Sequence, residues 1–355
     1  MTTSAKYLNR VYRYYSDFVV KTQSVSCVEG DITIAEWIGE FKPEKINVIP
    51  LFEDMEHMLG AHHIVREYLR DKRVDYQRVF LARSDPAMNY GLVSAVFLNK
   101  IALQRLSRLS EDLGIKIYPI IGVGSSPFRG NLSPQTVDRV IREYPSVHTF
   151  TIQSAFKYDY PPAEVREAIR KLRARTTSPP QEVDEEKCLE IIRKYTREYV
   201  NQIVVLAPMI NTVAKYVPSR RQRKLHIGLF GYSRSVEGII LPRAIPFTAA
   251  LYSIGLPPEI LGINALSKDD IQFIKSIYVN FEDDIRDALT YFNPDAGFLP
   301  KILEMKVGSL SLDYQPDEEH KEITGHILSA LRDGTRDLDL EECVLRAATL
   351  RKFLG

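Results

Sequence analysis

Cysteine is scarce in this sequence, and none of it is spaced for a metal site or a disulfide framework. Three cysteines occur in 355 residues, namely Cys27, Cys188 and Cys343, and no two of them form a Cys-x-x-Cys pair. This wide separation argues against a structural zinc site and against a fold stapled by disulfides. We therefore predict a protein of the reducing cytoplasm.

Long apolar runs and a strong net charge are lacking as well. Apolar runs such as 202–210 are far shorter than the ~20 residues that a membrane span needs, and the N-terminus has no signal-peptide core. The formal net charge is +1, which gives no bulk attraction to nucleic acid or to an anionic membrane. The basic run 219–224 has no aromatic stacking pattern around it, which favours a solvated strand entry over contact with nucleic acid. We predict a soluble protein that binds neither.

Five short apolar runs carry the signal for the fold. They are the segments 47–53, 78–85, 116–122, 148–154 and 224–231. Near-continuous apolar runs are typical of parallel strands that are buried on both faces. Amphipathic stretches at helical spacing, such as 55–69 and 91–113, lie between them. Alternating strands and helices predict an α/β protein.

The ends of these runs favour a barrel over a dinucleotide-binding sheet. Polar residues gather at the carboxyl end of each run, where α/β barrels and open sheets both place their active sites. No Gly-x-Gly-x-x-Gly follows the first run, so a dinucleotide fold has no support. We predict a TIM-type (β/α) barrel that is incomplete, because about five strands are present and a closed barrel has eight.

The rest of the chain predicts one domain, 1–355, with barrel strands and helices over 46–240 and a mainly helical layer over 241–355. A polar, proline-containing loop at 176–186 precedes a long predicted helix at 185–215. Helical patterns continue in the C-terminal layer at 243–254, 269–279, 283–291, 319–331 and 340–353. No internal repeat or clean linker interrupts them.

Two carboxylates follow neighbouring predicted strands. Glu53 ends the first run, beside Asp54, and Asp85 ends the second. Acids at the ends of adjacent parallel strands are able to hold one divalent ion, with phosphate and water completing the shell. The alternative is that each acid caps a helix or lies in a solvated loop.

Three arginines are candidates for binding an anion. Arg129 follows the third strand in a glycine-rich segment, and Arg234 and Arg243 flank the loop after the fifth. Small residues let backbone amides approach an anion, and a guanidinium offers a fork of donors. Arg243 lies at a predicted helix start, where it meets either the like charge of the helix or an anion. The alternative for Arg129 is an ordinary turn with a surface arginine.

Three histidines fall on one predicted helix, at His57, His62 and His63. Metal ligation from a helix needs an i, i+4 pair, and these spacings do not supply it. We therefore predict exposed or core histidines at these positions.

Several long segments resemble the archaeal-type phosphoenolpyruvate carboxylases, and they do so in order along the whole chain. The matching segments are IPLFED (49–54), FLARSDPAMNYG (80–91), PFRGNL (127–132), FTIQSAFKY (150–158), KLHIGLFGYSR (224–234), LPRAI (241–245), LPPEILG (256–262) and RKFLG (351–355). Gln153 and Lys157 lie in one of these segments without a role that we assign.

The resemblance implies a magnesium-dependent barrel enzyme, with Mn²⁺ as an alternative ion, that converts phosphoenolpyruvate and bicarbonate into oxaloacetate and phosphate. It implies that Glu53 and Asp85 bind the metal that stabilises the enolate, and that Arg129 holds carboxyphosphate or carbon dioxide. Arg234 and Arg243 would bind the phosphoryl and carboxylate groups and close the site. The family also implies a homotetramer.

The resemblance further implies a missing N-terminal part. Family members carry a Thr-Gln-His-Pro-Asp motif, which resembles the source of the general base, and a Leu-Arg-Val-Pro block, and this sequence has neither. We therefore expect a truncated form that lacks about three barrel strands. Two alternatives stay open. One is a non-catalytic phospho-ligand-binding or interaction subunit, and the other is a magnesium barrel enzyme that releases pyruvate.

Overall fold

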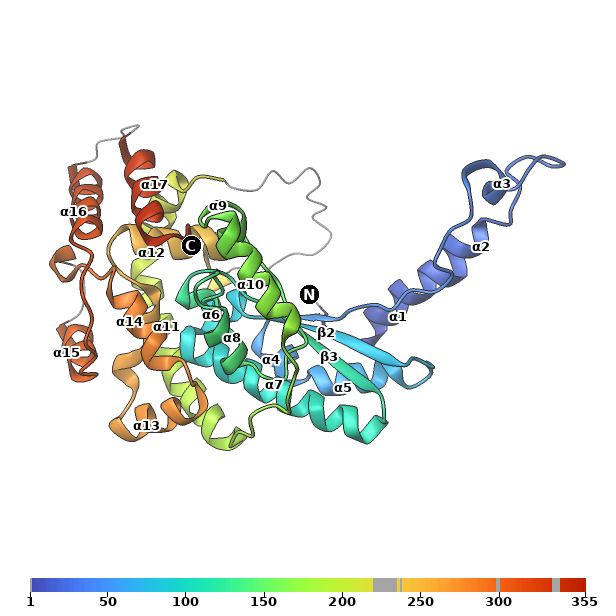
Figure 1. Cartoon of the computed structure of the whole chain (residues 1–355), viewed down its shortest axis with the longest axis horizontal. Coiled ribbons are helices and arrows are strands. Elements are labelled where there is room, and N and C mark those ends of the chain that lie inside the picture. Colours follow the sequence, from blue (N-terminus) through green and yellow to red (C-terminus); the bar gives the residue numbers. More distant parts are fainter. Residues whose placement is uncertain (1, 220–234, 237, 298–300, 334–338) are drawn as a thin grey trace.

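The computed structural model describes residues 2–219, 235–236, 238–297, 301–333 and 339–355 (Figure 1). A body of helices packed around a small sheet makes up most of the chain, and an N-terminal arm projects from it.

Four parallel strands form the central sheet. They are β1 (Leu51–Phe52), β2 (Tyr76–Ala82), β3 (Lys116–Gly122) and β4 (Thr149–Phe150), hydrogen-bonded in that order. Each strand lies within one of the predicted apolar runs or overlaps it. Such runs are stable as strands where both faces of the sheet are covered. The prediction of an α/β protein with parallel strands is confirmed for these four runs. The fifth predicted strand, 224–231, lies outside the described residues.

Helices connect the successive strands and lie along the sheet (Figure 1). They are α4 (Met55–Leu59) and α5 (Ala61–Leu69) after β1, α6 (Ser84–Tyr90) and α7 (Leu92–Leu113) after β2, and α8 (Val137–Glu143) after β3. The helix predicted at 55–69 is divided in two at Gly60, which ends α4 and begins α5. Gly91 separates α6 from α7 with a φ of +83°, and a Cβ there would lie 2.6 Å from the ring of Tyr195. Only glycine fits that position.

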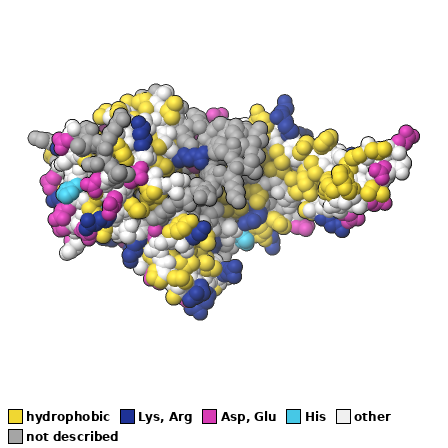
Figure 2. Space-filling model, turned by 90° about the horizontal axis from the view of Figure 1, so that it is seen from above, with side chains coloured by type: hydrophobic (Ala, Val, Ile, Leu, Met, Phe, Trp, Pro, Cys, Tyr) yellow, Lys and Arg dark blue, Asp and Glu magenta, His cyan; other side chains and the backbone are white. Residues whose placement is uncertain are grey.

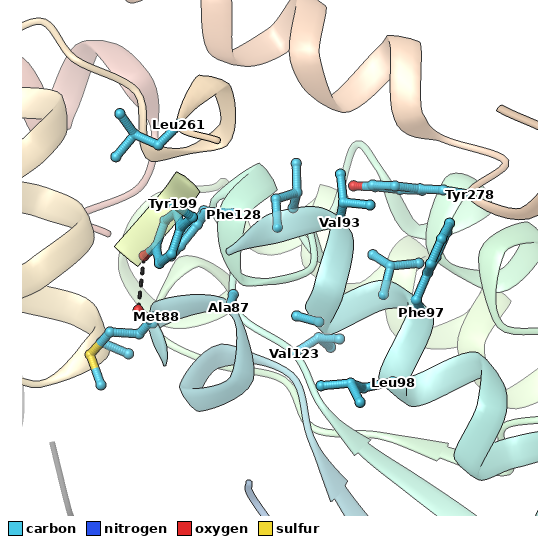
Figure 3. Packing of buried hydrophobic residues seen from close by; sticks show 14 of the residues in the cluster. Ala87, Met88, Val93, Phe97, Leu98, Val123, Phe128, Tyr199, Leu261 and Tyr278 are labelled. Carbon is cyan, nitrogen blue, oxygen red and sulfur yellow. Dashed lines mark hydrogen bonds between the residues drawn. The ribbon is translucent and has the colours of Figure 1, made fainter. Parts of the chain in front are cut away.

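The long helix α11 (Glu185–Val213) crosses α7 and joins the sheet layer to the C-terminal helices. Figure 3 shows Tyr199 of α11 donating a 2.8 Å hydrogen bond to the carbonyl oxygen of Met88. The ring of Phe128 stacks between Tyr199 and Phe247, with centroids 6.4 and 6.0 Å away. The loop that carries Phe128, the long helix α11 and the C-terminal helix α12 therefore share one apolar core.

Beyond the short antiparallel pair of β5 (Ser235–Val236) and β6 (Ile239–Ile240), the described chain is helical. The helices are α12 (Ala244–Ser253), α13 (Lys268–Ile277), α14 (Phe281–Leu289), α15 (Lys301–Ser309), α16 (Glu318–Asp333) and α17 (Asp339–Arg351). All five predicted helices of this layer are confirmed. A hydrophobic cluster of buried side chains extends from the first helix of the chain to α17.

Shorter elements complete the body. They are α9 (Ala155–Tyr158), α10 (Pro162–Ala174) and the 3₁₀ turns Pro127–Arg129, Ala214–Tyr216, Pro258–Ile260, Ile263–Ala265 and Pro294–Ala296.

The N-terminal arm consists of α1 (Ala5–Arg13), a π-helical segment (Tyr14–Val19), α2 (Val20–Thr22) and α3 (Ile34–Ile38). Of these elements, α1 packs on the body, against α5. Hydrophobic side chains gather along the arm (Figure 2), and Phe18 and Trp37 are 60% and 70% exposed. The sequence did not predict these helices.

No single helix among the described residues is long and apolar enough to cross a membrane. Helix α12 and the segment Pro258–Ala265, which are bent sharply against each other, together have the length and composition of a membrane span.

Candidate functional site at the carboxyl edge of the sheet

The carboxyl ends of the four strands bring the predicted acids to one edge of the sheet. Glu53 follows β1 directly and is 8% exposed. Because Phe52 pairs with Leu81, the residue after β1 lies beside the end of β2. Asp85 comes three residues after β2, in the first turn of α6, and is half-buried. Asp54 is a helix cap, which was the alternative to metal binding for these acids. Its side chain caps α4 by accepting a 2.9 Å hydrogen bond from the His57 amide.

Arg129 is buried at this edge, only 4% exposed, and its guanidinium joins segments that are far apart in the sequence. Its Nε donates to Ser84 Oγ at 3.2 Å, next to Asp85, and its Nη2 donates to Gln153 Oε1 at 2.7 Å, just beyond β4. Its Nη1 donates to the backbone oxygen of Gly355. The alternative of a surface arginine in an ordinary turn is therefore wrong.

Hydrogen bonds to the carbonyl and from the amide of Phe128 hold the turn that carries Arg129. The buried Arg83 donates to the carbonyl oxygen of Phe128 at 3.0 Å, and the Phe128 amide donates to Glu259 Oε1 at 2.6 Å. Gly124 leaves room for the arginine, because a Cβ there would lie 2.7 Å from the guanidinium carbon of Arg129. The glycine-rich segment thus lets Arg129 fold back over its own loop.

The last residue of the sequence reaches this site from the C-terminal layer. Gly355 is buried against the first turns of α12, and a Cβ on it would overlap the carbonyl oxygen of Ile245. Arg243 is the N-cap of α12 and is half-buried. Arg129 and the start of α12 therefore meet around Gly355, which places Arg243 in the same part of the molecule.

Arg351 anchors the tail that ends in Gly355. Its Nη1 lies 2.7 Å from His320 Nε2, and its guanidinium lies over the rings of Tyr252 and Phe353, 5.2 and 5.6 Å from their centroids. Burial lowers the pKa of Arg351 to about 10. Burial, helped by the charge of Arg351, lowers the pKa of His320 to about 2, so this imidazole is neutral and accepts a hydrogen bond.

Glu259 connects the tail layer to the Arg129 turn. Its Oε1 accepts hydrogen bonds from Tyr252 Oη at 2.7 Å and from the Phe128 amide. Burial raises the pKa of this carboxyl to about 8. A protonated Glu259 holds the turn without adding a negative charge near Arg129.

The structure brings together some of the predicted site residues and not others. Glu53, Asp85 and Arg129 lie at one edge of the sheet, and Arg243 lies near Gly355. Arg234 lies outside the described residues. Sequence reasoning missed Ser84 and left Gln153 without a role, although both adjoin predicted site positions. The resemblance includes Gly355 in the segment 351–355 but assigns it no role, and its contact with Arg129 spans 226 positions.

The two carboxylates Glu53 and Asp85 are enough ligands for a magnesium site of the kind that proteins usually form. Among the described residues there is no group of three or more His, Cys, Asp or Glu side chains that could hold a metal ion. Mg²⁺ usually keeps several waters and takes only one or two carboxylates plus substrate phosphates. The oxygen donors of Glu53 and Asp85, at one edge of the sheet, suit that mode.

Fold and site together define a class: an α/β protein whose parallel sheet carries two acids and a buried arginine at its carboxyl edge. The chain matches the family model described as phosphoenolpyruvate carboxylase over residues 1–355. It is 53% identical over 355 residues to the phosphoenolpyruvate carboxylase of Methanospirillum hungatei, and 52% identical over 356 residues to that of Methanothermobacter thermautotrophicus. Each match covers the whole of this chain and 73% of the relative. The chain belongs to the phosphoenolpyruvate carboxylase family.

Proposed function

We propose that this chain carboxylates phosphoenolpyruvate with bicarbonate, giving oxaloacetate and phosphate. Family membership supports the reaction. The observation that carries the proposal is the buried guanidinium of Arg129, fixed by Ser84, Gln153 and Gly355 beside the acid pair. A planar cationic fork held in place suits a carboxylate or phosphate better than a mobile surface charge does.

Glu53 and Asp85 would hold Mg²⁺, or Mn²⁺ in its place. When bound, the ion supplies positive charge that stabilises the enolate oxygen. The burial of Glu53 and the position of Asp85 beside Ser84 support this assignment. Asp85→Asn should weaken Mn²⁺ binding by more than tenfold in electron paramagnetic resonance titrations, whereas Asp54→Asn, at the cap of α4, should leave it unchanged. Equal affinity in wild type and Asp85→Asn would remove Asp85 from the site.

The bond changes assign a task to each arginine. An oxygen of bicarbonate attacks phosphorus, the bond from phosphorus to the enol oxygen breaks, and carboxyphosphate and the enolate of pyruvate result. Carboxyphosphate then releases carbon dioxide, and C3 of the enolate attacks it. Arg129 holds the carboxyphosphate and carbon dioxide, while Arg234 and Arg243 bind the phosphoryl and carboxylate groups. The amino-terminal end of α12 adds its partial positive charge at Arg243.

We also propose that the sheet is part of a (β/α) barrel within a single domain, and that the chain acts as a homotetramer in the cytoplasm. The parallel order of the four strands and their helical connections support the barrel. The exposed apolar side chains of the N-terminal arm, such as Phe18 and Trp37, support association between chains.

Product analysis tests the reaction. Any turnover by the chain, given phosphoenolpyruvate, bicarbonate and Mg²⁺, should give oxaloacetate, measured by coupling to malate dehydrogenase. Arg129→Ala should lower the rate by at least 10²-fold. The matched control is Arg170→Ala, an exposed arginine paired with Glu167 on α10, which should keep the wild-type rate. Pyruvate as the only product would contradict carboxylation, and binding of phosphoenolpyruvate without turnover would favour a non-catalytic subunit.

A further inference from the structure

A second cluster of arginines lies away from the carboxyl edge of the sheet. A pocket of about 300 Å³ opens between α5 and α7, which lie next to each other in Figure 1, and the first residue of α11 closes it. The basic side chains that line it are His62, His63 and Arg66 from α5 and Arg105 and Arg108 from α7. We call this the cationic pocket. None of these residues contributes to the Arg129 site, and the proposed carboxylation does not use them.

Two acids line the same pocket and compensate part of its charge. Glu185 is engaged by Arg105, whose Nε and Nη2 donate to Oε2 at 2.9 and 2.6 Å, and by Gln104, which donates to Oε1 at 2.9 Å. Arg105 also donates to the Leu59 carbonyl oxygen at 2.7 Å. Arg105 is therefore a structural residue that ties α7 to α11 and to the end of α4.

The other two arginines are more loosely held. Arg108 reaches Glu185 only at 3.6 Å, and its side chain is 64% exposed. Arg66 pairs with Asp112 at 2.6 Å, but both side chains are about half exposed, so solvent weakens this pair. Apart from the histidines, three arginines face two carboxylates, which gives a net charge of +1 for these five side chains.

Two histidine rings line the pocket beside the arginines. The rings of His62 and His63 lie 3.9 Å apart, and Nδ1 of His62 is buried with no hydrogen-bond partner among the described residues. This nitrogen has almost no accessible surface, so the His62 ring lines the pocket without offering Nδ1 to a ligand. Burial, with the charges of His63, Arg105 and Arg66, lowers the pKa of His62 to about 4, so the ring is neutral in the empty pocket.

We propose that the cationic pocket binds a small dianion, either inorganic phosphate or a short dicarboxylate. Arg108 and Arg66 offer forked donors from two helices, beside the histidine rings that line the pocket. A doubly charged anion engages both arginines at once, whereas chloride satisfies one.

Calorimetry with phosphate and with succinate tests this site in the 355-residue chain at constant ionic strength. We expect Arg108→Ala to weaken binding by about tenfold or more, as expected for a lost charge-assisted hydrogen bond. Arg108 is exposed, so its removal leaves the fold intact. Arg129→Ala should keep this binding, which separates the pocket from the site at the sheet edge, and the exposed control Arg170→Ala should keep it too.

The two titrations also identify the source of the dianion. Binding of phosphate alone assigns the pocket to phosphate, and binding of succinate alone assigns it to dicarboxylates. No binding of either anion, or equal binding in wild type and Arg108→Ala, would overturn the proposal. A shift of the His62 ring resonance in NMR on saturation, absent in Arg108→Ala, gives an independent readout of binding in the pocket.

Discussion

The molecule presents arginines in two contrasting settings. At the sheet edge, Arg129 is buried and fixed by side chains and backbone from segments 24, 45 and 226 positions away. In the cationic pocket, Arg66 and Arg108 lie half-exposed beside carboxylates. Burial strengthens an arginine's field and fixes its direction, whereas water and paired acids weaken it. The first setting suits a transition state, and the second suits reversible binding.

The largest effect should come from Gly355→Ala. The added Cβ would overlap the carbonyl oxygen of Ile245, which is backbone and cannot rotate away. The tail must then shift, and Arg129 loses the partner of its Nη1. We expect turnover of phosphoenolpyruvate to fall by about 10²-fold or more, because a displacement of about 1 Å at a catalytic group has that effect.

Gly325→Ala is the matched control for this change. Gly325 lies in α16 and has no atom within 4 Å of the added Cβ. Turnover should be unchanged, and the helix should gain roughly 0.5–1 kcal/mol of stability. Normal turnover by Gly355→Ala would show that the tail does not position Arg129.

A smaller effect is expected for Gln153→Ala. It removes one of the hydrogen bonds that orient Arg129 and leaves Ser84 and Gly355 in place. We expect kcat/KM for phosphoenolpyruvate to fall about tenfold, consistent with the loss of one hydrogen bond to a charged group. Lys157→Ala is the control from the same segment, since Lys157 is exposed. Equal kinetics in Gln153→Ala and wild type would mean that the guanidinium does not need this support.

The buried carboxyl of Glu259 predicts a dependence of stability on pH. Its pKa is about 8 in the folded chain, against an ordinary value of 4.5. The folded chain therefore holds a proton that the unfolded chain releases, and this contribution to the free energy of unfolding falls as pH rises from about 4.5 to about 8.

Glu259→Gln should remove that contribution while keeping an oxygen acceptor for Tyr252 and for the Phe128 amide. Urea unfolding at pH 6 and pH 8.5 should show a smaller loss of stability in Glu259→Gln than in wild type. The same loss in both proteins would contradict the raised pKa.

The smallest effect should come from the cationic pocket. Arg66→Ala breaks an exposed pair with Asp112, and such pairs contribute only about 0.2–1 kcal/mol. Thermal unfolding should change little, and any change should shrink further in 1 M salt. A large, salt-independent loss of stability would mean that the two settings do not differ as described.

The sequence predicted the parallel strands and the C-terminal helices because the local spacing of their apolar residues indicates which faces are buried. Continuous apolar runs such as 116–122 are stable only in a covered sheet, and the helices of the last third carry their own apolar faces. The break at Gly60 was missed because the apolar spacing continues across it. The N-terminal arm was missed because Phe18 and Trp37 stay exposed, so its pattern does not report a core.

The candidate site was only partly predictable for a different reason. Glu53, Asp85 and Arg129 follow strands, so the topology of a parallel sheet brings them to one edge. The contact of Arg129 with Gly355 depends on how the C-terminal layer packs on α12, and no local pattern encodes it. The cationic pocket likewise needs α5, α7 and α11 to come together, although His62 and Arg66 are four positions apart on one helix.

Calorimetric titration of phosphoenolpyruvate in the presence of Mg²⁺, with wild type, Arg129→Ala and Arg170→Ala, tests the central claim most directly. We predict one binding event in wild type and in Arg170→Ala, and its loss or weakening by at least about tenfold in Arg129→Ala. Undiminished binding by Arg129→Ala would contradict the assignment of the substrate site to the carboxyl edge of the sheet.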